Sequence, residues 1–274
     1  MKKSKILILA VLTLLIVPMF AVPTFANPQD EDNANRSTFD ESKAQIISQN
    51  IRYFKTVEAY RNVERDSYGN IISGDLLGSE TYEMTKEEWD QTDFDDNTQT
   101  RDQTTIVTAY KMMTAALLYD GNTYRYRNEL SWMSFPAVRS YDVIGIGHAN
   151  NVTAADTPSF TLEYITEMGL HFYGLFNYQQ SFSNGKSATF TLPLEELQSL
   201  TITYYFDVKK IDQDETITYQ EVYGDYAHGI DTSITFSDAI NHDVIGSLGI
   251  QHDYSVWYMF DTIDEADVYW NGIW

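Results

Sequence analysis

The sequence predicts an all-β fold, an antiparallel β-sandwich or partly open barrel of about ten to twelve strands with a few short helical turns. Short segments of strand-type alternation recur along the chain and are separated by turn signals, as in sandwiches. The 20 tyrosines and 14 phenylalanines supply aromatic side chains that suit sheets. A Pro- or Ser-rich linker is not found after residue 40, which favours a single domain.

The strongest strand signal lies at 124–132, where apolar and aromatic residues alternate with charged ones. Pro136 lacks a backbone donor, so this strand is predicted to end near Phe135. A second apolar strand follows at 141–146, and its Gly145 indicates a bulge or a close approach of two backbones. The Gly-Ile-Gly sequence here does not open a helix, so it does not predict a phosphate-binding loop.

Hairpins and isolated strands account for most of the remaining chain. The turn at 66–70 connects the strands 56–65 and 71–74, and the Asp120-Gly121 turn follows 104–119, which we interpret as one strand throughout. The segment 200–208 is apolar on both sides, which predicts a central strand. Further strands are predicted at 80–84, 159–166, 169–178, 187–192, 216–223, 230–236, 249–260 and 266–270.

Four short helices or helical turns are predicted. Capping boxes at Thr38–Glu41 and Thr85–Glu88 each indicate the start of a helix, and Trp89 is expected to anchor the second one. Pro193 at a first helical position predicts a turn over 193–197. A last helical turn is predicted at 237–240.

The first 26 residues are typical of a secretory signal peptide. Lys2, Lys3 and Lys5 precede an apolar run, and the sequence ending at Ala26 fits a cleavage site. Residues 27–50 are interpreted as a disordered or partly helical leader, and residues 51–274 as the β-rich domain. We therefore expect a secreted, extracellular protein with no membrane span after cleavage. A cysteine for lipid attachment is absent.

Charge and cysteine content exclude several classes of partner and site. The formal charge is −22, and removal of the signal-peptide lysines makes it more negative, which argues against nucleic acid and anionic membranes. Such a surface suits cations, a basic partner or simply solvent. The chain has no cysteine, so it has no disulfide, thiolate metal site or cysteine nucleophile.

Three segments carry a resemblance to known proteins: RSYDVIGIG at 139–147, YYFDVKK at 204–210 and YGDYAH at 223–228. In these segments the chain resembles a family of secreted proteins of Gram-positive bacteria, and the similarity runs from about Ser79 to the C-terminus. The resemblance implies a signal peptide followed by a strand-rich chain. It implies no activity, cofactor or catalytic residue.

Histidines and acidic residues suggest two metal sites, although the prediction that we favour is a protein without a cofactor. His228, His242 and His252 lie near acidic residues, a combination common in zinc sites, but their spacing matches no zinc motif. Asp93, Asp95 and Asn97 have the oxygen spacing of a calcium loop. Thr98 and Thr104 replace the glycine and glutamate of an EF-hand, so any calcium site here is a different one.

Three classes of function remain. The absence of recognisable catalytic motifs favours a non-catalytic extracellular or cell-surface binding module that contacts a glycan or the cell wall. For this class we expect Trp270 and Trp274, near the end of the chain, to be exposed and to bind the ligand. A secreted hydrolase with a carboxylate or histidine–metal site is the second class. A toxin-like or bacteriocin-like β-protein is the third, and the acidic charge counts against it.

Overall fold

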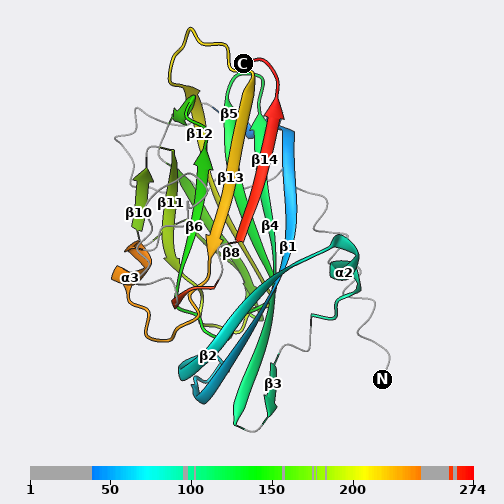
Figure 1. Cartoon of the computed structure of the whole chain (residues 1–274), viewed down its shortest axis with the longest axis vertical. Helices are drawn as coiled ribbons and strands as arrows, with labels where there is room; N and C mark the ends of the chain where they lie inside the picture. Colours follow the sequence, from blue (N-terminus) through cyan, green and yellow to red (C-terminus); the bar gives the residue numbers. More distant parts are fainter. Residues whose placement is uncertain are drawn as a thin grey trace.

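Two antiparallel sheets packed face to face form the body of the molecule (Figure 1). The computed structural model describes residues 39–94, 98–101, 103–155, 158–174, 176, 178–182, 184–241, 259–261 and 264–274. The first sheet has the order β2-β1-β4-β5-β12-β8-β9, with β3 paired to β4 and β7 paired to β12. The second has the order β10-β11-β6-β13-β14. Both sheets are open, so the sandwich prediction is confirmed and the barrel alternative is not observed.

The strands of the first sheet are β1 (Gln45–Arg65), β2 (Ile71–Met84), β3 (Thr98–Arg101), β4 (Thr104–Tyr119), β5 (Tyr124–Ser134), β7 (Val152–Ala154), β8 (Ser159–Thr166), β9 (Gly169–Tyr173) and β12 (Ser199–Lys210). Those of the second are β6 (Tyr141–His148), β10 (Tyr178–Phe182), β11 (Gly185–Thr191), β13 (Tyr219–Ala227) and β14 (Asp264–Asn271). The described helices are η1 (Glu41–Lys43), α2 (Lys86–Gln91) and α3 (Phe236–Asn241).

The main core fills the space between the sheets and follows from the alternation along each strand. In β8 every second residue is buried, and β12 supplies Leu200, Ile202, Tyr204, Phe206 and Val208 from one face. β12 pairs with β5 on one side and β8 on the other, which confirms the prediction of a central strand at 200–208. The second sheet contributes residues such as Ile144, Phe190 and Val222 to this core.

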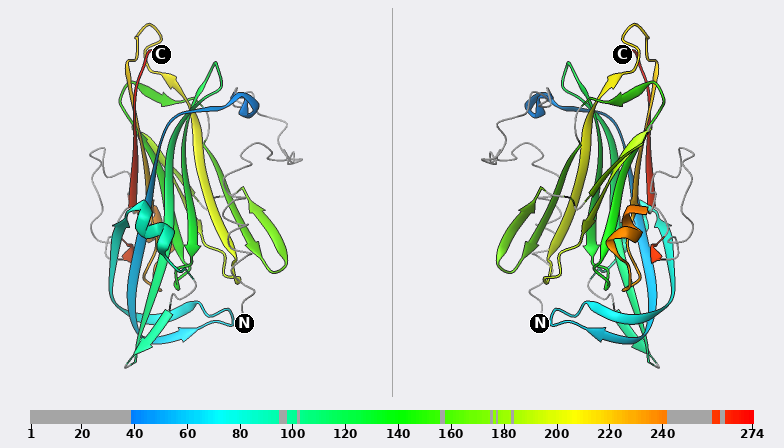
Figure 2. Two further views of the ribbon diagram at one scale, coloured as in Figure 1. Left: turned by 90° about the vertical axis from the view of Figure 1, so that its right-hand side faces the viewer. Right: turned by 90° about the vertical axis from the view of Figure 1, so that its left-hand side faces the viewer.

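The first sheet extends beyond the second as an arm, by which we mean the hairpin end of β1 and β2 with β3 and the start of β4 (Figures 1 and 2). β1 and β4 pair without interruption from the arm into the sandwich. A small cluster that includes Tyr60, Ile71 and Val107 packs the arm against the loop between β5 and β6. The arm is therefore attached to the body through continuous strands and a small core of its own.

Most predictions for β1–β6 are confirmed. The turn at 66–70 joins β1 to β2, residues 104–119 form the single strand β4, and β5 ends at Ser134, before Pro136. The capping box of Thr85 and Glu88 starts α2, and the buried ring of Trp89 lies 4.9 Å from that of Tyr53. These segments carry local signals that tertiary packing does not oppose.

Several expectations are wrong. β1 begins at Gln45, so the sheet includes residues 45–50 of the stretch interpreted as a leader, and η1 is one 3₁₀ turn capped by Asp40. Residues 193–197 form no helix. Residues 230–236 were expected to form a strand, but they form a turn that leads into α3. The residues of α3 confirm the helical turn at 237–240. Most of 249–260 lies outside the described residues.

A buried arginine explains why residues 39–44 lie against the sandwich. The guanidinium of Arg125 is 4.0 Å from the centre of the Phe39 ring and 4.3 Å from that of Tyr205. Arg125 Nε donates to Asp207 at 2.7 Å, and its Nη1 donates to Glu41. The backbone N–H of Asp40 donates to Asp120 at 2.6 Å. This segment is thus fixed by charge and ring contacts.

In the part of the chain that the structure describes, no helix has the length and apolar character needed to cross a membrane.

Candidate functional site

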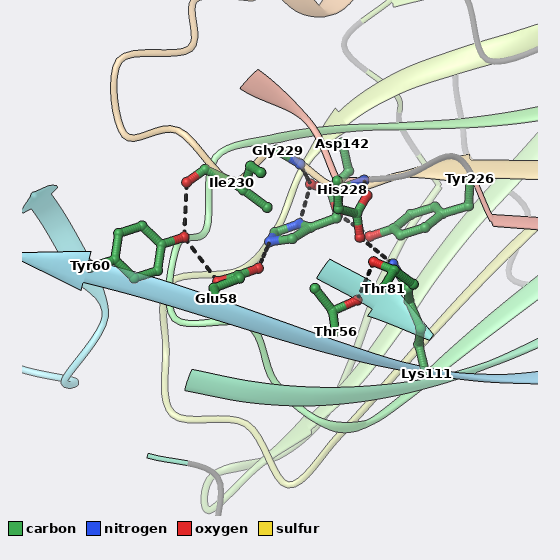
Figure 3. A network of polar contacts seen from close by, with 11 residues as sticks. Thr56, Glu58, Tyr60, Thr81, Lys111, Asp142, Tyr226, His228, Gly229 and Ile230 are labelled. Atoms are coloured by element: carbon green, nitrogen blue, oxygen red, sulfur yellow. Dashed lines mark hydrogen bonds and ion pairs between the residues drawn. The ribbon is translucent and has the colours of Figure 1, made fainter. Parts of the chain in front are cut away.

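A cluster of ionisable side chains lies between the two sheets where the arm joins the body (Figure 3). The buried polar cluster, as we call it, consists of Glu58, Lys111, Asp142, His228 and Asp261. Their exposed fractions are 1%, 0%, 0%, 0% and 5%, respectively. Ionisable side chains are rarely buried this completely unless they pair with one another, so the contacts within the cluster determine what it can do.

Both sheets contribute to the cluster. Glu58 in β1 and Lys111 in β4 come from the first sheet, and both belong to the face that packs on the second. Asp142 comes from β6 of the second sheet. His228 follows β13 directly, and Asp261 lies a few residues before β14. An isolated bridge between Gly229 and Phe260 brings these last two segments together.

Asp142 and Asp261 are the acceptors at the centre of the cluster. Asp142 Oδ1 lies 2.9 Å from His228 Nδ1 and accepts from the backbone N–H of Gly229 at 3.2 Å. Its Oδ2 accepts from the hydroxyl of Tyr226. Asp261 Oδ1 accepts from the backbone N–H of His228 at 2.7 Å, and its Oδ2 accepts from Lys111 Nζ. Each carboxyl group is therefore held from two sides.

Glu58 completes the cluster on the arm side. One of its oxygens accepts from the Tyr60 hydroxyl at 2.9 Å, and the other faces His228 Nε2 at 3.9 Å. Burial raises the pKa of Glu58 above its ordinary value, even though His228 and the Tyr60 hydrogen bond oppose the shift. Burial lowers the pKa of His228, but the Asp142 carboxylate and Glu58 outweigh burial, so the net shift is upward.

Aromatic rings enclose the lysine. The Nζ atom of Lys111 lies 5.1 Å from the ring centre of Trp132 and 5.2 Å from that of Tyr226. Trp132 also meets the ring of His228 edge-on at 5.5 Å. These rings separate the amine from solvent, so a ligand from outside does not reach the cluster without movement of the core.

A second candidate site is open to solvent and lies where β8 and β9 meet the end of β11. This edge pocket has a volume of about 220 Å³. Its lining combines aromatic rings, aliphatic side chains and one carboxylate, and consists of Leu162, Tyr164, Tyr173, Phe190, Thr191, Leu192, Pro193 and Glu195. β9 is an edge strand of the first sheet, while β11 belongs to the second, so the pocket opens between the layers.

Stacked rings line the β9 side of the edge pocket. The rings of Tyr164 and Tyr173 are parallel within 2° at 5.7 Å, and His171 stacks on Tyr164 at 4.8 Å. Tyr173 is 52% exposed, whereas Tyr164 is buried. Cross-strand pairing of Leu162 with Tyr173 and of Tyr164 with His171 places these rings on one face. The pocket thus offers a flat, partly solvated aromatic surface beside a carboxylate.

The structure places only part of each predicted metal site. His228 lies in the buried polar cluster, whereas His242 and His252 lie outside the described residues, so the zinc prediction stays a prediction. Asp93 is exposed, and Asp95 and Asn97 likewise lie outside the described residues. Within the described ranges, no group of three or more histidine and acidic side chains is arranged to hold a metal ion.

The two tryptophans predicted to bind a ligand are only half-exposed. Trp270 and Trp274 pack against the core, with ring centres 5.7 and 4.6 Å from that of Tyr124. Lys210 Nζ lies 5.8 Å from the centre of the Trp274 ring. Their expected exposure is therefore corrected, while their role in ligand binding stays a prediction.

Sequence reasoning missed Glu58, Lys111 and Asp261. One signal was present, because Lys111 occupies an inward position of β4 between Ala109 and Met113, where strand alternation predicts an apolar residue. Two segments that carry the family resemblance supply Asp142, Tyr226 and His228. No local pattern links these residues to Lys111, since only the packing of the two sheets brings them together.

Comparisons with known proteins give no assignment. No protein-family model and no curated protein matches the chain. A solved structure of manganese lipoxygenase of Gaeumannomyces graminis with part of zonadhesin of Komagataella pastoris matches with a TM-score of 0.26 and 5% identity, over 64% of this chain and 75% of that chain. The T6 backbone pilin of serotype M6 Streptococcus pyogenes matches with a TM-score of 0.30 and 10% identity, over 81% of this chain and 64% of that chain. Similarity this low carries no argument about function.

Proposed function

We propose that this chain is a secreted, non-catalytic β-sandwich module that binds a glycan of the cell wall or of another extracellular surface through the edge pocket. The observation that carries the proposal is the exposed, stacked ring of Tyr173 beside Glu195 in a pocket between the sheets. The apolar CH faces of a sugar pack on such rings. A carboxylate at the rim accepts hydrogen bonds from its hydroxyl groups.

The edge pocket fits the binding of a glycan better than its hydrolysis. Hydrolysis of a glycosidic bond ordinarily needs two carboxyl groups on opposite sides of that bond. Glu195 is the one carboxylate among the described lining residues of the pocket. The buried polar cluster contains three more, but these are buried in the core and are not among the lining residues of the pocket.

Titration calorimetry with purified cell-wall polysaccharide and a panel of soluble oligosaccharides tests the proposal. Tyr173→Ala removes the exposed ring and is expected to weaken binding by about two- to tenfold, the effect of losing one ring contact. Glu195→Gln is expected to weaken binding less, because the amide keeps one acceptor. Equal affinity of the wild type and Tyr173→Ala for every bound glycan would exclude the pocket as the site.

The two tryptophans that the sequence predicts to bind the ligand provide a control for Tyr173→Ala at another surface. Trp270 belongs to β14 of the second sheet, and Trp274 follows three residues after the end of that strand. If Trp270→Ala abolishes glycan binding while Tyr173→Ala does not, the binding surface is the tryptophan pair. Absence of binding to any glycan tested would contradict the proposed ligand class.

A further inference from the structure

The buried polar cluster combines the groups needed for a reaction of the chain with itself. Lys111 supplies an amine, and Asp261 supplies a carboxyl group in direct contact with that amine. Both side chains have no exposed surface. An external substrate therefore does not reach them, whereas the two side chains are already within reacting distance of each other.

We propose that Lys111 and Asp261 form an intramolecular amide (isopeptide) bond between Nζ and Cγ, with Glu58 as the group that transfers the protons. The bond would join β4 of the first sheet to the segment before β14 of the second. The proposal does not depend on the glycan-binding function.

The reaction is a condensation that balances without a co-reactant. The Nζ atom of the neutral amine attacks Cγ of the protonated Asp261 carboxyl group, and an N–C bond forms. The nitrogen gives a proton to Glu58, and Glu58 gives a proton to the departing hydroxyl group. The C–O bond breaks, and one water molecule leaves. The ion pair and the product differ by that water alone, so no oxidant or reductant is consumed.

The reaction requires a neutral amine and a neutral acid, and transfer of one proton from Lys111 to Asp261 gives both. In a buried pair the charged forms have lost most of their hydration energy, which removes the main cost of this transfer. The rings of Trp132 and Tyr226, which lie next to Lys111 Nζ, provide an apolar surrounding for the pair. They also exclude the water that would hydrolyse the product.

A backbone donor is in place for the charge that develops on Asp261. The N–H group of His228 donates to Asp261 Oδ1 at 2.7 Å. When Lys111 attacks, negative charge accumulates on this oxygen, and a fixed donor stabilises it. Asp142 holds His228 in position, because Nδ1 of the histidine ring lies 2.9 Å from Asp142 Oδ1. Asp142 is thus a positioning residue for the donor.

Glu58 has the surroundings expected of a proton carrier. Its carboxyl group is 1% exposed and lies in the same buried cluster as Lys111 (Figure 3). The hydroxyl of Tyr60 and Nε2 of His228 lie on its two oxygens at 2.9 and 3.9 Å. Burial raises the pKa of Glu58 above its ordinary value, which makes its carboxylate a better proton acceptor.

The pair of Arg125 and Asp207 is an internal control. This pair is also buried, and Arg125 Nε donates to Asp207 at 2.7 Å. A guanidinium group stays protonated in proteins, however, so it does not act as a nucleophile. The two pairs therefore share burial and differ in chemistry. We expect a covalent bond at Lys111 and none at Arg125.

Peptide mapping of the folded, full chain tests the proposal directly. Trypsin cleaves after a free Lys111 and gives the peptides 102–111 and 112–125, whereas residues 211–274 contain no lysine or arginine. A bond blocks that cleavage and links 102–125 to 211–274, with the mass of both peptides less one water. The linked peptide is the expected result. Recovery of 102–111 and unlinked 211–274 from the folded wild type would overturn the proposal.

Variants then assign the roles. Asp261→Asn is expected to give a linked peptide of unchanged mass, because ammonia leaves instead of water. Lys111→Met abolishes the link, and the control Asp207→Asn retains it. Glu58→Gln, checked for folding by circular dichroism, is expected to lose the link or to form it at least tenfold more slowly. Linkage at the wild-type rate in folded Glu58→Gln would overturn the proton-transfer role of Glu58. Mapping of the wild type does not depend on any variant folding.

Discussion

Gly224 of β13 faces Asn128 of β5 so closely that a Cβ atom on the glycine would lie 2.8 Å from the Cγ atom of the asparagine. Asn128 is buried, and its Nδ2 donates at 3.0 Å to the carbonyl oxygens of both Gly145 and Asp225 in the second sheet. A polar side chain of one sheet thus bonds the backbone of the other. Gly145 itself lies in regular pairing with Ser187 and Asp225, so the bulge that the sequence indicated as one alternative is not found there.

Gly224→Ala is expected to destabilise the protein by about 1–3 kcal/mol, the usual cost of forcing an extra carbon atom into a packed core. Urea denaturation measures the change in the free energy of unfolding. Gly78→Ala in β2 is the matched control, because a Cβ atom there meets nothing within 4 Å. A cost for Gly224→Ala no larger than that of the control would contradict the close contact between the sheets.

Stability is expected to fall as the pH rises from about 4.5 towards neutrality and beyond. Burial raises the pKa of Glu58 above its ordinary 4.5, and Asp142 and Glu58 raise the pKa of His228 above 6.5 despite burial. The folded state therefore binds more protons than the unfolded chain, and the associated stability is lost as the pH passes through the folded pKa values. The other charged groups facing them are Lys111, Asp142 and Asp261.

Glu58→Gln is expected to reduce this pH dependence, because the amide does not titrate. The free energy of unfolding is measured by urea denaturation at a series of pH values from 4 to 8. Glu64→Gln, at an exposed position of β1, is the matched control and should leave the slope as in the wild type. A stability that rises with pH over this range would contradict the predicted sign.

The contact of Arg125 with the segment before β1 predicts a large loss of stability on substitution. Arg125→Met removes the ion pair that Arg125 makes with the Asp207 carboxylate, which is 2% exposed. Breaking one side of a buried pair costs about 3–5 kcal/mol, measurable by urea denaturation. Residues 39–44 should also become sensitive to protease. Lys86→Met, in the exposed pair with Asp90, is the control and should change stability little.

The fold was predictable because its signals are local. Alternation predicted β5, an apolar run predicted β12 as a central strand, and the turn residues between 66 and 70 and at Asp120 and Gly121 located two hairpins. Errors occurred where tertiary contacts override the local pattern. Residues 45–50 read as a leader, but β4 provides a pairing partner along their length. Residues 230–236 read as a strand, but they turn at Asp231 and lead into α3.

The candidate sites were predictable only in part, because they depend on which strands face each other. His228 was recognised as a chemically interesting residue, but the zinc interpretation grouped it with other histidines instead of with Asp142 and Glu58. The edge pocket joins β8 and β9 to the end of β11, and no spacing in the sequence indicates that these strands meet. A lysine at an inward strand position was the one usable clue.

Tyr173→Ala and Trp274→Ala are expected to have opposite effects on stability and on glycan binding. Tyr173 is 52% exposed, so its removal should leave the melting temperature nearly unchanged while glycan binding weakens. Trp274 packs on Tyr124, and its backbone exchanges hydrogen bonds with Ile217 at 2.9 and 3.1 Å. Its truncation should lower the melting temperature and leave glycan binding intact, measured by calorimetry. Loss of binding in folded Trp274→Ala alone would move the ligand to the tryptophan pair.

The arm is not a lever that swings by itself. From Arg61 to Ser48, β1 pairs residue by residue with β4, so a hinge between the arm and the sandwich would have to break strand pairing. The hairpin turn is tied to the body as well, because Asn70 Nδ2 donates to the carbonyl oxygen of Leu194 at 2.7 Å and the N–H group of Ile71 donates to that of Ala137 at 2.8 Å. The β1–β2 hairpin is thus bound at both ends, and a pull on its turn is carried into the body through these contacts as well as along the strands.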